Sequence, residues 1–182
     1  MKLFNDEVPW VPWVSLAARL VLGGVLIWSG GAKVGNLASS VQAANAYQIV
    51  PYEVAQVIGY GLPFAEIGLG LALVLGLFTR IGGALGALLM LAFIIAIASV
   101  WARGISVDCG CFGGGGPIDP AEATAKYPWE LLRDTGLMIL GLWLVFIKAN
   151  KWAVDGWLLR PAEEMVARKD VPRAGTKGKK KR

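Results

Sequence analysis

The sequence contains no histidine, two cysteines and few charged residues, and each shortage excludes a class of function. Without histidine, the chain cannot form a Cys-His or Ser-His dyad, ordinary haem ligation or most zinc sites. Two cysteines cannot complete a tetrahedral metal site, so we expect no metal site within the chain. Charged residues make up 17% of the 182 residues and hydrophobic residues 55%, which is typical of a membrane-embedded protein.

Four long apolar runs hold most of the hydrophobic residues. They cover residues 13–31, 54–78, 81–101 and 129–147, and each is close to the roughly 20 helical residues that cross a bilayer. We therefore predict an all-α, polytopic membrane four-helix bundle over residues 13–148. Because only two residues separate the second run from the third, these two helices should form a tight antiparallel hairpin.

Basic residues gather after the last apolar run and predict the orientation of the bundle. Residues 149–182 form a basic tail, and such an excess of Lys and Arg marks the cytoplasmic side. With four spans, the N-terminal residues 1–12 are then cytoplasmic as well, and the loops at 32–53 and 102–128 face outward. Beyond the net charge of +5, no feature predicts nucleic-acid binding.

Two charged residues interrupt the apolar runs. Arg19 lies in the first run and Glu66 in the second. An isolated charge at mid-membrane costs about 3 kcal/mol, so each residue needs a partner or a polar cavity. At about 1.5 Å per helical residue, both lie roughly 20 Å below the outer surface. We therefore predict an ion pair between Arg19 and Glu66 that fixes helix register. A proton relay through the two residues is the alternative.

Small residues at four-residue spacing predict where the helices approach one another. Gly68, Ala72 and Gly76 form one such stripe on the second run, and Gly82 and Gly86 form another on the third. Small side chains let helix backbones come close in lipid, where apolar burial alone does not drive association.

The two cysteines lie in the second outward loop. Cys109 and Cys111 are separated by one glycine, and the predicted topology places them in a space where disulfides persist. A disulfide across one residue constrains little chain, so it is a poor structural staple. Strained bridges of this kind are also readily exchanged. The pattern therefore favours a thiol–disulfide exchange site over a structural bridge.

Charged residues near this loop bear on which thiol is more reactive. Lys33, Arg103 and Arg133 all fall near the predicted outer boundary, where cations would favour the thiolate. Asp108 opposes this effect at the adjacent Cys109, so we favour Cys111 as the more reactive thiol. The three cations have an alternative role as anchors at helix ends.

Arg133 has a further alternative, because the next residue, Asp134, offers it a local ion pair.

Several segments resemble DoxX-type membrane proteins. Residues 19–33 look like their first helix, and residues 66–80 look like their second helix and its turn. The Asp-Cys-Gly-Cys-Phe-Gly segment and residues 129–134 narrow the resemblance to the MauE-like branch, and it covers residues 13–147. The resemblance implies a four-helix protein of the bacterial plasma membrane that is associated with redox metabolism. It also implies links to the maturation of disulfide-rich proteins and to quinone electron transfer.

Three functions fit these features. The first is a membrane thiol–disulfide oxidoreductase, in which Cys109 and Cys111 exchange with an exported thioredoxin-like partner and electrons pass to or from a membrane quinone. No covalently bound cofactor is expected, and no motif specifies the quinone site. The second is a non-catalytic assembly factor or accessory subunit of a larger membrane complex. The third is a small transporter built around Arg19 and Glu66.

Overall fold

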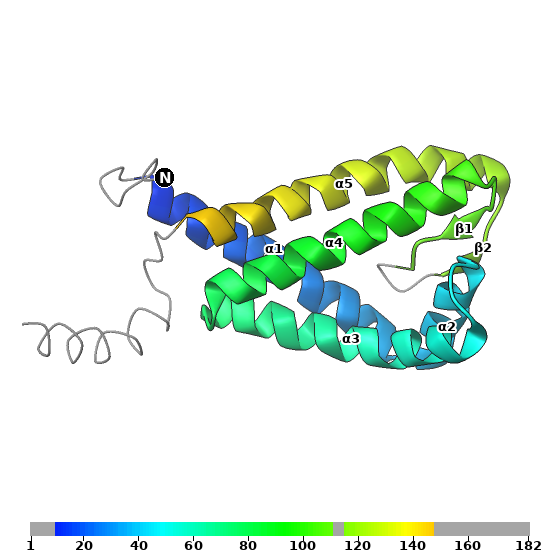
Figure 1. Cartoon of the computed structure of the whole chain (residues 1–182), viewed down its shortest axis with the longest axis horizontal. Coiled ribbons are helices and arrows are strands. Elements are labelled where there is room, and N and C mark those ends of the chain that lie inside the picture. Colours follow the sequence, from blue (N-terminus) through cyan, green and yellow to red (C-terminus); the bar gives the residue numbers. More distant parts are fainter. Residues whose placement is uncertain (1–9, 111–114, 148–182) are drawn as a thin grey trace, which may run out of the picture.

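Four long helices run side by side along most of the molecule (Figure 1). The structure, a computed structural model, describes residues 10–110 and 115–147. The long helices are α1 (Val11–Val34), α3 (Tyr52–Leu75), α4 (Thr79–Ala102) and α5 (Pro120–Phe146). They confirm the predicted four-helix bundle. The basic tail and the first nine residues lie outside the described residues.

α5 begins well before the predicted fourth run. Asp119 caps its first turn, since the Asp119 carboxylate accepts a hydrogen bond of 2.8 Å from the Ala121 N–H. Pro120 then occupies the first helical position, where its missing N–H costs nothing. The apolar run at residues 129–147 therefore predicted only the later part of α5.

The helices have the length and surface of a multi-pass membrane protein. Among the described residues, α1, α3 and α4 are each long and apolar enough to cross a membrane, whereas charged residues in the first half of α5 lower its hydropathy. Exposed aromatic residues nevertheless mark both ends of the apolar part of α5, with Trp129 at its start and Phe146 at its end. They lie about 25 Å apart along the helix, close to the thickness of a bilayer core.

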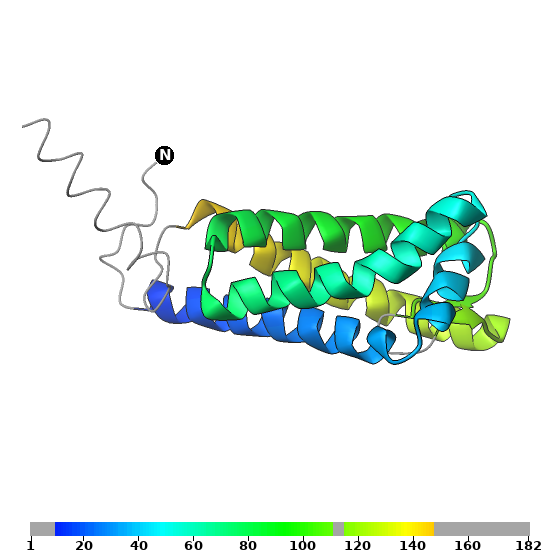
Figure 2. The same ribbon diagram turned by 90° about the horizontal axis from the view of Figure 1, so that it is seen from below.

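The bundle consists of two closely packed pairs, α1 with α3 and α4 with α5 (Figure 2). Glycines make both contacts. A Cβ atom added to Gly70 would lie 2.7 Å from the Gly23 carbonyl oxygen, and one added to Gly141 would lie 2.8 Å from the Gly83 carbonyl oxygen. α3 and α4 are joined by a tight turn, but they pack against each other less extensively than either packs in its own pair. The helical hairpin of α3 and α4 is therefore not one of the two closely packed pairs.

The predicted glycine stripe on α3 is wrong. A Cβ atom added to Gly68 would meet no atom within 4 Å, and Gly76 ends α3 in the left-handed conformation, with φ of 74°. On α4 the prediction holds better, since Gly82 faces Leu73 and Gly86 faces Leu22. Spacing alone did not show which face of α3 meets α1.

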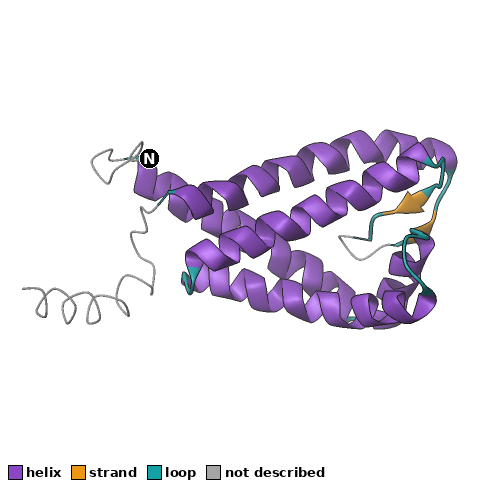
Figure 3. Cartoon of the chain, viewed as in Figure 1, coloured by secondary structure: helices purple, strands orange, loops and turns teal. Residues whose placement is uncertain are grey.

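A cap of small elements closes one end of the bundle (Figures 1 and 3). It contains the helix α2 (Leu37–Ala46) and the two-stranded antiparallel hairpin of β1 (Val107–Asp108) and β2 (Gly116–Pro117). Both predicted outward loops thus lie at the same end, as expected for an even number of spans between them. α2 was not predicted. Asn36 starts it, since its side chain accepts a hydrogen bond from the Ser39 N–H at 3.1 Å.

Replacing Gly70 by alanine tests the α1–α3 contact. The new methyl group would lie 2.7 Å from a backbone oxygen, so Gly70→Ala should lower the free energy of unfolding in detergent by about 1–3 kcal/mol. Gly68→Ala, on the open face of the same helix, is the matched control and should leave stability unchanged or slightly raised. Equal effects of the two substitutions would contradict this packing.

Candidate functional site

Cys109 directly follows β1, and a tyrosine on α5 fixes that strand in place. The Tyr127 hydroxyl accepts a hydrogen bond of 2.9 Å from the Val107 N–H, and it lies 2.9 Å from the Ile105 carbonyl oxygen. Val107 and Tyr127 are both buried in a small apolar cluster between the hairpin and the ends of α4 and α5. The position of Cys109 relative to α5 is therefore set by packing rather than by a free loop. Cys111 lies outside the described residues.

A carboxylate on α5 faces the Cys109 thiol. The donor atoms of Cys109, Asp108 and Glu130 all lie within 4.8 Å of one another. The thiol donates a hydrogen bond to the Glu130 carboxylate. Glu130 is 8% exposed, and its Oε2 atom has no hydrogen-bond partner among the described residues. No role for Glu130 is predicted from the sequence, in which it lies one helical turn before Asp134.

Asp108 is held in the charged form by its own contacts. Its Oδ1 accepts the Gly110 N–H at 3.0 Å, and its Oδ2 lies 3.1 Å from the Lys126 ammonium. Burial alone would raise the pKa of Asp108, but the Gly110 and Lys126 contacts outweigh it, so this pKa is lowered. Lys126 also binds Glu122 at 2.6 Å, and hydrogen bonds to both carboxylates raise the pKa of Lys126.

These contacts also bear on metal binding. Asp108, Cys109 and Glu130 offer donor atoms of the right kind, but both oxygens of Asp108 are already engaged by the Gly110 N–H and the Lys126 cation. A cation this close would repel a metal ion. We therefore interpret the three residues as a hydrogen-bonded cluster and assign no metal to them.

The three cations predicted to support the thiolate each bind another acceptor. Lys33 points into the bundle, where it binds Glu66. Arg103 donates to backbone carbonyls of α4 and of the turn after α2, at Ser99, Tyr47 and Gln48. It therefore ties the cap to α4. Arg133 binds Asp134 with an Nη2–Oδ1 distance of 2.8 Å, which confirms the local pair considered from the sequence.

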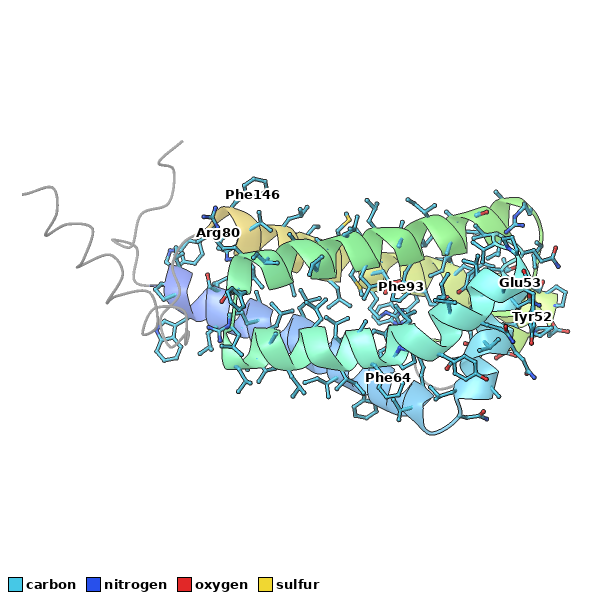
Figure 4. All side chains as sticks on the ribbon, turned by 60° about the horizontal axis from the view of Figure 1, so that its bottom comes forward. Tyr52, Glu53, Phe64, Arg80, Phe93 and Phe146 are labelled. Atoms are coloured by element: carbon cyan, nitrogen blue, oxygen red, sulfur yellow. The ribbon has the colours of Figure 1, made fainter. Side chains whose placement is uncertain are left out.

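A buried ion pair inside the bundle joins α1 to α3. Lys33 Nζ lies 2.7 Å from Glu66 Oε1 and 3.0 Å from Oε2, and it donates to Ser29 at 3.0 Å. Ser29 in turn donates to Glu66 at 3.3 Å. Glu66 is fully buried and Lys33 is 9% exposed. Lys33 Nζ also lies 5.4 Å from the centre of the Phe93 ring, which points into the bundle while Phe64 points outward (Figure 4).

The predicted ion pair between Arg19 and Glu66 is wrong. Arg19 instead donates to the carbonyl oxygens of Leu73 and Val74, at 3.0 and 3.2 Å. These carbonyls belong to the last turn of α3, where helix oxygens lack their usual partner four residues on and a cation is favoured. Leu73 lies two turns beyond Glu66, which is about 10 Å along the helix axis.

The error came from the register of α3. The predicted pair requires the outer ends of α1 and α3 to lie at the same level. In the structure α3 begins beyond the end of α1, and its first turns pack against α2, where Gly59 meets Val41. Glu66 therefore lies opposite the C-terminal part of α1, which carries Ser29 and Lys33.

One family model matches the chain. Its description is Methylamine utilisation protein MauE, and the match covers residues 11–147, which is well over half of the chain. No curated protein and no solved structure matches significantly. The matched segment runs from the start of α1 to the end of α5, so it contains both clusters described above.

A double-mutant cycle distinguishes the two partners of Glu66. Combining Glu66→Gln with Lys33→Met should give a coupling energy above about 1 kcal/mol in the free energy of unfolding, because each single change leaves the other residue buried without its partner. Combining Glu66→Gln with Arg19→Met should be additive within about 0.5 kcal/mol.

Glu53→Gln serves as the control, since Glu53 is exposed on the first turn of the same helix (Figure 4). Coupling of Glu66 to Arg19 rather than to Lys33 would contradict the observed register.

Proposed function

Because the chain belongs to the MauE family and has the helices of a multi-pass membrane protein, we propose that it is a membrane thiol–disulfide oxidoreductase. In this proposal Cys109 and Cys111 exchange with an exported thioredoxin-like protein. The observation that carries it is the hydrogen bond from the Cys109 thiol to Glu130, a buried carboxylate with one oxygen available to accept a proton.

In the first step Cys111 attacks the partner. Its thiolate forms a bond to one sulfur of the partner's disulfide, that disulfide breaks, and the other partner sulfur leaves as a thiolate. The product is a mixed disulfide on Cys111. Cys111 is assigned this role because the carboxylates beside Cys109 disfavour a negative sulfur there.

In the second step Cys109 resolves the mixed disulfide. The Cys109 thiol gives its proton to Glu130, and the resulting thiolate attacks the Cys111 sulfur. A Cys109–Cys111 disulfide forms and the partner's second sulfur leaves as a thiolate. The chain loses two electrons and the partner gains two. Asp108 does not compete for the proton, since Gly110 and Lys126 already bind its two oxygens.

The same steps run in reverse, with the direction set by the partner's reduction potential. A membrane quinone is the redox partner that we assign to restoring the cysteine pair, because it carries the two electrons of one disulfide within the same bilayer. We place the cysteine loop on the outer side of a bacterial plasma membrane. In support, the cap and the α3–α4 turn lie at opposite ends of the bundle (Figure 1), and the basic tail favours a cytoplasmic C-terminus.

Replacing one cysteine at a time should separate the two roles. Reduced protein in lipid nanodiscs is mixed with a purified, oxidised thioredoxin-like protein, and mixed disulfides are followed on non-reducing gels. Cys109→Ser should accumulate the mixed disulfide, because the resolving thiol is missing. Cys111→Ser should accumulate much less, because the attacking thiol is missing.

The double cysteine variant is the control and should form no adduct. Absence of an adduct in both single variants, with partner and chain folded, would favour the alternative of a non-catalytic assembly factor.

A further inference from the structure

Buried polar groups continue from Glu130 into the bundle. Asp134 follows Glu130 by one turn of α5, with about 6 Å between their Cβ atoms, and Asp134 is 1% exposed. Its Oδ1 binds Arg133. Within the part of the chain that the structure describes, Asp134 Oδ2 and Glu130 Oε2 are buried without a hydrogen-bond partner. Two neighbouring carboxylates thus each keep one oxygen available for a proton.

A small cavity lies between Asp134 and Ser29, and so between α5 and the polar cluster of α1 and α3. Its lining is mostly apolar, with Ser29, Arg133 and Asp134 as the polar members, and its volume is at the lower limit of the room that one water molecule needs. Ser29 extends the connection, since it is hydrogen-bonded to both residues of the buried ion pair.

The charges of this buried set favour the uptake of one proton. Its titratable members are Glu130, Asp134, Arg133, Lys33 and Glu66, and Lys33 acts electrostatically on Asp134 as well as on Glu66. Three carboxylates thus face two cations. In a low-dielectric interior, one added proton would make the set neutral.

The remaining neighbours add no net positive charge to this set, and Asp108 acts on Glu130 in the direction that favours the proton. α4 lines the cavity with Met90 and Phe93, which do not titrate. On the exposed side, Asp108 is paired with Lys126, and Glu122 shares that cation.

The set is closed toward the opposite end of the bundle. Leu22, Leu26 and Leu73 are at most 1% exposed and pack in the central apolar core. Arg19 lies beyond this core, ten residues before Ser29, which is about 15 Å along α1. A proton that enters from the cysteine end therefore has no polar route onward through these residues.

We propose that Glu130, Asp134 and the Ser29–Lys33–Glu66 cluster form a proton store for Cys109, open at the thiol and closed at the other end. The proton that leaves the Cys109 sulfur passes to Glu130 and is shared with Asp134, while no electron moves with it. It returns by the same route when the thiol re-forms. This proposal rests on the proposed exchange function, in which Cys109 must lose its proton before it resolves the mixed disulfide.

The test measures how fast Cys109 resolves the mixed disulfide on Cys111. A small aromatic disulfide takes the place of the protein partner. Reduced protein in nanodiscs reacts with dithionitrobenzoate, and release of the second thionitrobenzoate reports the attack of Cys109 on the mixed disulfide. In the unchanged protein this rate should vary by less than about threefold between about pH 8 and pH 6, because the base is internal. In Glu130→Gln and in Asp134→Asn the same rate should fall about tenfold for each unit by which the pH is lowered, as for a thiol that ionises into solvent.

Two further variants keep the result interpretable. Glu122→Gln, which changes an exposed carboxylate on the first turn of α5, should keep the flat profile. Asp134→Glu should restore the flat profile if Asp134→Asn acts through proton transfer rather than through misfolding.

If the rate depends steeply on pH in Glu130→Gln but not in folded Asp134→Asn, the proposed proton store is contradicted, and Glu130 acts as a base without Asp134. A steep profile in the unchanged protein would overturn it as well. Because the probe is a small disulfide, these outcomes are independent of whether a thioredoxin-like protein is the natural partner.

Discussion

The ion pair between Lys33 and Glu66 is the constraint on which the rest of the bundle depends. A lone charge in the hydrocarbon core costs about 3 kcal/mol, so the helices α1 and α3 are held where both charges meet. At that register the glycines of the two helices come into contact, with Gly23 against Gly70. Arg19 then reaches the last carbonyls of α3 and supplies the cation that a helix C-terminus favours.

The same register connects the bundle interior to its capped end. Ser29, which completes the ion-pair cluster, also lines the cavity shared with Asp134. From Asp134 the polar groups continue along one face of α5 to Glu130, which meets the thiol of Cys109. The hairpin that carries this thiol is fixed by the Tyr127 hydroxyl rather than by a long loop. A single set of contacts thus positions the thiol and brings the proposed proton acceptor, Glu130, next to it.

Periodicity and charge located the helices but not their contacts. Apolar runs predicted the four long helices, because the bilayer sets their length, and the adjacency of Arg133 and Asp134 predicted their pair. The predicted pairing of Arg19 with Glu66 was wrong because the register of α3 depends on its packing against α2, and α2 lies in a segment that was predicted to be a loop. Glu130 was missed because several acidic residues flank the cysteines, and only the packing of β1 on α5 selects one of them.

The central claim is that Cys109 and Cys111 form a reversible redox pair. It is tested most directly by equilibrating the protein in nanodiscs with thiol–disulfide buffers of graded potential, trapping free thiols with an alkylating reagent and counting the adducts by intact mass. The account predicts one transition from two adducts to none, with the same midpoint from the oxidised and the reduced side. Two adducts at every potential would contradict it, since the cysteines would then never form a disulfide.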